Sequence, residues 1–441
     1  MIILSLNNVR RIIFFIFTNI LIILLIIPKN NGISKTLTII PYGVIGIAVM
    51  VFFISAHFKQ FKIFNVIWKL NYIDVMIMIL PLLYYLLSLK SMYAENSLLA
   101  ISEMWIILII YNFSKICWID EKFFKIFSII ITLLGSYLAI VTINKIHLWI
   151  WLFQKQQFID IRDIRNTMPT VNSMPIGMWA SVLLGFSALV LIISTIWKYN
   201  YPCNNLIIIF LELCFVIINI AIIATLSRGA LFGLLSMLTL NLIGSVVVKE
   251  KMFLRVLKLY VINILLTIIV FFLMGIHPSI KKSVLLTSPT ESQVRSVHGR
   301  IFIWKNNVEL FKNYPIFGVG PKNYGLVNVA ISGKTDKINY TGQSFNIFFQ
   351  LLSECGLIGI IYFITTSVLI LLKIIKIYKC SNNRVLKIIT VSLISGLIGI
   401  FIRDLTYSSI FNIEISILIA CIISLISVFE NKYINTTATL T

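Results

Sequence analysis

The sequence has few charged residues for its length, and acidic residues are the scarcer kind. Charged residues make up 12% of the 441 positions, with 16 Asp and Glu against 37 Lys and Arg. Because soluble globular domains carry about 25% charged residues, this composition excludes an ordinary soluble enzyme. It also excludes a disordered basic tail, since 59% of the residues are hydrophobic. The composition is typical of an integral membrane protein.

The sequence also lacks the residue patterns that bind metals. Its six cysteines include no Cys-x-x-Cys pair, which argues against a disulfide framework and against a zinc site. His147, His277 and His298 have no partner at ligand spacing. We therefore expect no metal site and no cofactor.

Long hydrophobic runs are abundant. A helix needs roughly 20 apolar residues to span the hydrocarbon core of a membrane. About a dozen segments have this length: 12–27, 37–56, 70–89, 97–113, 123–143, 178–197, 205–226, 230–248, 256–274, 346–372, 388–406 and 410–429. They predict an all-α, polytopic membrane protein with about 12 transmembrane helices, in a single domain over residues 1–441.

The basic residues indicate how these helices are oriented. Short cytoplasmic loops of membrane proteins are rich in Lys and Arg. Here the basic residues gather in alternate loops, at 10–11, 59–69, 115–125, 249–258 and 373–387. We expect these loops and both termini to be cytoplasmic. Roughly half of the 37 basic residues are then explained by topology, and no nucleic-acid partner is predicted.

The N-terminal apolar run is expected to be a retained helix. Arg10 and Arg11 precede it, and no small-residue cleavage site follows it. This pattern favours a first membrane helix over a signal peptide.

Two connections on the opposite side of the membrane are long, at residues 144–177 and 275–345. Long loops often carry function. The second is basic on the side where positive charge is disfavoured, so it calls for an anionic partner; the alternative is attraction to lipid headgroups. Part of it should be helical, because apolar residues recur at helical spacing until Pro315. These residues are Ile301, Trp304, Val308 and Phe311. A helix lying on the membrane surface fits this pattern.

Two arginines are candidates for an anion site on the outer side. Arg228 begins an apolar segment within Ser227-Arg228-Gly229-Ala230, where the helix dipole favours negative charge. Arg300 begins the helical run of the large loop. Because guanidinium groups bind phosphate oxygens bidentately, the pair could clamp a diphosphate. The alternative is that each arginine reaches a lipid headgroup or solvent.

Several acids fall within apolar segments, where they are costly unless they are paired. Glu354 has Arg403 as a candidate partner, and the alternative is that Arg403 pairs with the adjacent Asp404. For the remaining acids we expect structural pairing or interfacial placement: Asp74, Glu103, Glu212 and Glu414.

Three groups of residues between positions 200 and 370 together form a distinctive pattern. They are Leu226-Ser227-Arg228-Gly229-Ala230, the run from Arg300 through Trp304 and Pro315 to Phe317-Gly318-Val319-Gly320, and Asn346 with Gly356 and Gly359. In order, spacing and outer placement they resemble the O-antigen polymerase and O-antigen ligase superfamily of bacterial inner-membrane glycosyltransferases.

The resemblance implies transfer of a glycan from an undecaprenyl diphosphate carrier to a sugar hydroxyl at the periplasmic face of the inner membrane. Arg228 and Arg300 would then bind the carrier diphosphate and stabilise its departure. Arg165, Asn346 and Arg403 are further candidates for binding the diphosphate or the glycan. The expected partners are this lipid-linked oligosaccharide, membrane lipid and a chain-length regulator protein.

One position departs from the ligase pattern. Ligases typically have a histidine directly before the asparagine, as the base for the acceptor hydroxyl, whereas Phe345 precedes Asn346 here. Phenylalanine cannot accept a proton, so the pattern favours a polymerase, and His298 is the nearest candidate base by its chemistry. One alternative is a ligase that transfers glycan to lipid A-core. Another is a lipid-linked oligosaccharide flippase, although a flippase needs a polar cavity that opens to both sides.

Overall fold

The computed structural model describes residues 71–437, except for 157–169, 172–173, 202–203, 249–252, 275–290, 328–343, 382 and 409–411. This part of the chain is helical apart from one pair of two-residue strands. The helices are α4 (Tyr72–Ser88), α5 (Ala94–Ile119), α6 (Glu121–Gln156), α8 (Ile176–Asn200), α9 (Asn205–Ala224), α10 (Arg228–Val247), α11 (Phe253–Met274), α13 (Glu291–Asn313), α15 (Ile347–Cys380), α16 (Arg384–Asp404) and α17 (Ile413–Thr437). Strands β1 (Thr170–Val171) and β2 (Met174–Pro175) pair antiparallel just before α8.

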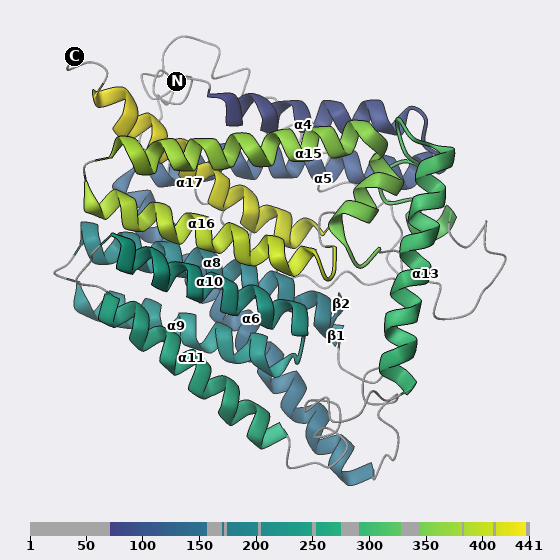
Figure 1. Cartoon of the computed structure of the whole chain (residues 1–441). Coiled ribbons are helices and arrows are strands. Elements are labelled where there is room, and N and C mark those ends of the chain that lie inside the picture. Colours follow the sequence, from purple (N-terminus) through teal and green to yellow (C-terminus); the bar gives the residue numbers. More distant parts are fainter. Residues whose placement is uncertain are drawn as a thin grey trace, which may run out of the picture.

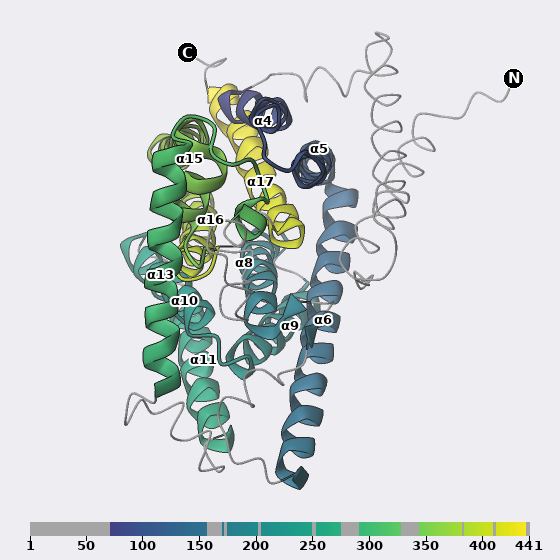
Figure 2. The same ribbon diagram turned by 90° about the vertical axis from the view of Figure 1, so that its right-hand side faces the viewer.

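The helices form a bundle with one helix across its end. Helix α13 crosses the end of the bundle at which α10 begins and α16 finishes (Figure 1). Helix α8 lies inside, where it packs against α6, α9, α10, α16 and α17 (Figure 2). Because its sequence is apolar on all sides, burial of nearly all its side chains is expected, and the structure shows it.

The predicted segments agree with the helices of the bundle. Segments 12–27 and 37–56 lie outside the described residues, and each of the others coincides with a described helix. Seven of these helices are long and apolar enough to cross a membrane, namely α5, α6, α8, α9, α10, α15 and α16. The chain is therefore an integral membrane protein. The total of about 12 spans stays a prediction, because it includes the undescribed segments.

The helix predicted around residues 301–311 is confirmed as part of α13. Helix α6 continues to Gln156, so it includes the first third of the connection predicted at 144–177. Placement of α13 on a membrane surface stays a prediction.

Helices α10 and α16 approach each other closely through glycines. A Cβ atom added at Gly233 would lie 2.5 Å from the carbonyl oxygen of Gly399, and one added at Gly399 would lie 2.8 Å from that of Gly233. Small residues of this kind let helix backbones approach each other in membranes. The contact brings the start of α10 beside the end of α16.

Three of the four acids for which structural pairing was expected, Asp74, Glu103 and Glu212, form ion pairs. Asp74 pairs with Lys115 at 2.7 Å between Oδ1 and Nζ. Glu212 pairs with Arg255 across α9 and α11. The carboxylate of Glu103 pairs with the ammonium of Lys322, which follows α13.

Helix α15 is broken at Gly356, and residues 315–320 fill the break. We call the break and these residues the α13–α15 joint. Gly356 has a φ of +61°, which glycine adopts readily because it has no Cβ. Four backbone hydrogen bonds close the joint: Val319 N–H to the Ser353 carbonyl (2.9 Å), Gly320 N–H to Glu354 (3.0 Å), Leu357 N–H to Pro315 (2.8 Å) and Ile358 N–H to Ile316 (3.3 Å). These bonds satisfy backbone groups that the break would leave unpaired.

The buried acid Glu354 fixes the chain just beyond the joint. Its carboxylate accepts hydrogen bonds from the backbone N–H groups of Lys322 (2.7 Å) and Tyr324 (3.2 Å). The phenol of Tyr324 donates a hydrogen bond to the carbonyl of Ile303 in α13. Burial raises the pKa of this phenol, so it stays protonated as a donor. Arg403 was only a candidate partner of Glu354, and the pair does not form, because backbone N–H groups of the loop satisfy this carboxylate.

Candidate active site

The end of the bundle beneath α13 holds the buried residue Arg403. This arginine is 1% exposed and lies in the last turn of α16. Its Nη2 donates to the carbonyl of Gly177 at 2.8 Å, and its Nη1 donates to the carbonyl of Tyr407 at 3.1 Å. Asp404 also attracts it electrostatically, in agreement with the adjacent-pair interpretation.

Two aromatic rings connect Arg403 to Arg300. The guanidinium carbon of Arg403 lies 4.8 Å from the ring centre of Tyr407. Tyr407 meets Phe345 edge to face at 5.1 Å, and the guanidinium carbon of Arg300 lies 5.2 Å from the centre of the Phe345 ring. Arginine over an aromatic face is stabilised by the ring quadrupole. The structure therefore brings Arg300 and Arg403 to the two sides of one aromatic pair.

Helix α13 and the start of α15 hold Phe345 in place. The indole of Trp304 stacks on Phe349 at 5.2 Å and donates to the carbonyl of Ser344 at 2.9 Å. The Ser344 hydroxyl donates to Oδ1 of Asn307 at 2.8 Å. Phe345 itself has a φ of +51°, which is uncommon for a residue with a side chain. Such conformations persist where the surroundings determine them, and they cluster at functional sites.

Arg228 lies on the other side of Arg403. It is the first residue of α10 and is exposed, and Ser227 occupies the N-cap position without a capping hydrogen bond from its side chain. The next residue, Gly229, approaches α16 so closely that an added Cβ would lie 1.9 Å from Oγ1 of Thr406 and 3.3 Å from Cδ of Arg403. We call Arg228, Arg300 and Arg403 the arginine cluster.

The electrostatics of the cluster favour an anion. The charges of Arg300 and Arg403 act on each other repulsively. An anion bound beside them would relieve this repulsion, and guanidinium groups are well suited to phosphate. Arg228 adds an exposed positive charge at a helix N-terminus, where backbone N–H groups also favour anions.

Asn346 joins the same end of the bundle through the start of α15. Its Oδ1 accepts hydrogen bonds from the backbone N–H groups of Phe348 (2.9 Å) and Phe349 (3.4 Å). Its Nδ2 donates to the carbonyl of Leu405 at 3.0 Å. The side chain therefore caps α15 and ties it to the end of α16.

Replacing Asn346 by alanine is expected to lower the free energy of unfolding by about 1 kcal/mol, because the helix cap is lost. Asn346→Asp keeps the cap acceptor and loses only the donor to Leu405, so it should be less destabilising. Denaturant titration of the purified protein in detergent would measure both. Equal stability of all three proteins would argue against the capping role.

The structure thus brings four of the six predicted site residues together: Arg228, Arg300, Asn346 and Arg403. Arg165 lies outside the described residues. His298 belongs to α13, but its side chain is not among those described, so its role as a base stays a prediction.

Sequence reasoning missed the residues that connect the arginines. Tyr407, Thr406 and Gly177 belong to no motif, and two of them act mainly through backbone atoms. Gly229, next to Arg228, was a usable signal, because it allows close approach of another helix, but it does not identify that helix.

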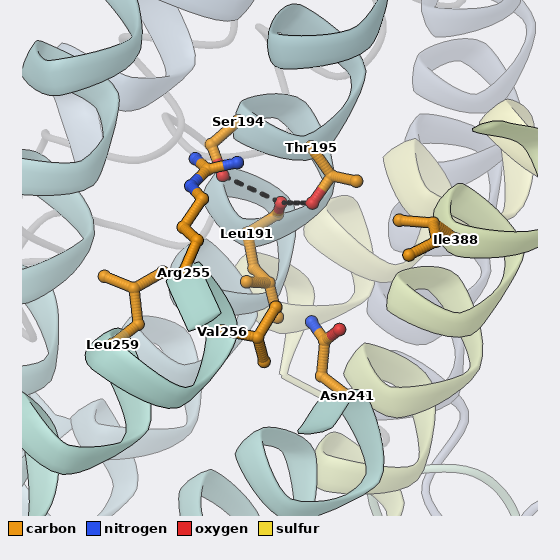
Figure 3. A pocket seen from close by; sticks show the side chains of 8 residues that line it. All are labelled: Leu191, Ser194, Thr195, Asn241, Arg255, Val256, Leu259 and Ile388. Atoms are coloured by element: carbon orange, nitrogen blue, oxygen red, sulfur yellow. Dashed lines mark hydrogen bonds between the residues drawn. The ribbon is translucent and has the colours of Figure 1, made fainter. Parts of the chain in front are cut away.

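A narrow crevice lies apart from the arginine cluster. Helices α8, α10, α11 and α16 line it, and its cavity volume of about 10 Å³ holds about one water molecule (Figure 3). Arg255 faces it from the first turn of α11 and is paired with Glu212. Helices α10 and α11 are consecutive and antiparallel, so the first turn of α11 lies beside the end of α10 (Figure 1). Arg228 is at the start of α10, so the crevice lies toward the opposite end of the bundle from Arg228.

Comparison with protein families gives a match to part of this chain. Residues 213–364 match the model of a family described as O-antigen ligase. The match supports the O-antigen polymerase and ligase superfamily for this segment. The match extends from α9 into α15, so it includes Arg228, Arg300, Phe345 and the joint but not Arg403. No curated protein matches the chain.

The superfamily predicted from the sequence is therefore confirmed. It implies a glycosyltransferase activity on lipid-linked glycans within a membrane. The matched segment contributes two of the three members of the arginine cluster, and α16, beyond it, contributes the third.

Proposed function

We propose that this protein is an O-antigen polymerase that joins oligosaccharide repeat units carried on undecaprenyl diphosphate, at the periplasmic face of the bacterial inner membrane. The observation that carries the proposal is the place of Phe345. This ring lies between Arg300 and Tyr407, at the position where ligases that the chain resembles have a histidine. Arg300 therefore lies over a position without a proton acceptor.

The cluster is suited to the departure of a diphosphate. In the transfer, a bond forms between the acceptor oxygen and the anomeric carbon of the donor glycan, and the bond from that carbon to the diphosphate breaks. Negative charge develops on the departing diphosphate, and fixed guanidinium groups stabilise such charge. We assign Arg228 and Arg300 to this task.

The proton of the acceptor hydroxyl needs a separate acceptor. His298 is our candidate by chemistry and by its place in α13, two residues before Arg300. A good leaving group makes general-base help less necessary, since such help contributes roughly 10²- to 10⁴-fold.

The ligase is the second candidate, because the matching family is described as O-antigen ligase. It would use the same carrier and the same arginines, and lipid A-core would be the acceptor. A chain-length regulator stays a predicted partner of the polymerase.

Deletion of the gene separates the two candidates. For a polymerase, the deletion strain is expected to make lipopolysaccharide that carries a single repeat unit, because ligation continues without chain extension. The ladder of lipopolysaccharide on a gel measures this. Core without any repeat unit, with long polymer collecting on the carrier, would instead establish the ligase, and an unchanged ladder would contradict both.

A further inference from the structure

We infer that Arg403 is a positioning residue that fixes the start of α10, and through it Arg228, for the proposed glycan transfer. The inference rests on the proposed function. It assigns diphosphate binding to Arg228 and Arg300, and it assigns the positioning of Arg228 to Arg403. It also replaces the prediction that Arg403 binds substrate.

The guanidinium of Arg403 is already occupied by the protein. Its two terminal nitrogens donate to the carbonyls of Gly177 and Tyr407, and its Nε is buried without a hydrogen-bond partner among the described residues. At 1% exposure the side chain is closed off from a ligand in solution. Arg228, by contrast, is exposed at the first position of α10. Only the exposed arginine of this pair presents its guanidinium for a bidentate contact with phosphate.

The carbonyl of Gly177 links Arg403 to the cap of α10. This oxygen accepts from Arg403 at 2.8 Å and from the hydroxyl of Ser227 at 3.5 Å. Ser227 is the N-cap residue of α10 and is adjacent to Arg228. Arg403 therefore holds the start of α8 and the start of α10 in one place.

The first turn of α10 also rests directly on the end of α16. Gly229 leaves no room for a side chain against Thr406 and Arg403. Thr406 is held in turn by a hydrogen bond from its hydroxyl to the carbonyl of Arg403 at 2.8 Å. A shift of the Arg403 side chain or of Thr406 would consequently move the backbone that carries Arg228.

A double-mutant cycle tests this division of roles. Reconstituted full-length protein is supplied with a lipid-linked repeat unit, and the initial rate of polymer formation is measured for wild type, Arg403→Lys, Arg228→Lys and the double variant. Lysine keeps the charge but cannot donate to both carbonyls in the same geometry. We expect Arg403→Lys to have a rate at least about 10-fold below that of wild type. The double variant should have a rate less than about 3-fold below that of Arg228→Lys alone.

Rates are expressed per folded molecule, determined from thermal unfolding. A merely structural role of Arg403, or an independent contact with the substrate, gives losses that multiply in the double variant. Multiplied losses would overturn the inference.

Gly229→Ala tests the same contact without changing an arginine. The new methyl group displaces the first turn of α10 from Thr406, so Gly229→Ala should lower the rate as much as Arg403→Lys does. Adding Gly229→Ala to Arg228→Lys should lower the rate little further. Thr406→Ala in the Gly229→Ala background should restore part of the rate, because the closest clash is with Oγ1 of Thr406. Full activity of Gly229→Ala would contradict the inference.

The two proposals can fail separately. If wild type forms no polymer in the assay, the proposed function fails. If wild type is active and Arg228→Lys is impaired while the losses multiply, only the positioning role of Arg403 fails.

Discussion

Replacement of Arg228 by lysine is expected to lower the rate of polymer formation at least about 100-fold, because a preorganised donor to developing negative charge contributes about 10² to 10³ in rate. Lysine keeps the charge but loses the planar pair of donors that matches phosphate oxygens. Arg300→Lys should have an effect of the same order. The initial rate with a lipid-linked repeat unit is the measurement.

The chain offers a matched control for this substitution. Arg384 is also an exposed arginine at the first position of a helix, with a capping asparagine before it. It begins α16 and therefore lies at the opposite end of that helix from Arg403. Arg384→Lys should retain the wild-type rate. If Arg228→Lys and Arg300→Lys were as active as Arg384→Lys, the diphosphate site would lie elsewhere.

Replacement of Gly356 by alanine is expected to lower the free energy of unfolding by about 3 kcal/mol or more. Its φ of +61° and ψ of −158° belong to a region that is essentially restricted to glycine, where other residues cost about 1 to 3 kcal/mol. A Cβ would also lie 2.5 Å from the carbonyl oxygen of Ile316, and overpacking adds about 1 to 3 kcal/mol. Denaturant unfolding in detergent measures the loss.

Gly177→Ala is the control for stability. A Cβ at Gly177 meets nothing within 4 Å, and the residue is in the first turn of α8. Alanine there should leave the free energy of unfolding unchanged or slightly raised, since alanine favours helix more than glycine does. Equal stability of the two variants would show that the joint does not depend on the conformation of Gly356.

The helices of the bundle could be predicted because their signals are local. Hydrophobic runs report membrane segments directly, and apolar spacing up to Pro315 reports α13. Arg228 and Arg300 could be singled out for the same reason, since a charge beside an apolar segment is visible in a short window of sequence.

Contacts between distant residues could not be predicted in this way. The partners of Glu354 are backbone N–H groups at Lys322 and Tyr324, and any residue except proline supplies such a group. The attachment of Arg403 to the Gly177 carbonyl is of the same kind. At Gly356 the close approach is made by the backbone of Ile316 and not by a neighbouring helix.

The hydrogen bonds of the α13–α15 joint have a consequence for how freely its sequence can change. All four run between backbone atoms, so they place no requirement on the side chains of Ile316 or Phe317. The side chain of Ile316 is 55% exposed and points away from the packed interior. Such a position can exchange one apolar or polar group for another while Gly318 and Gly356 keep the geometry. The joint thus separates glycines that maintain the architecture from the side chain of Ile316, which is free to vary.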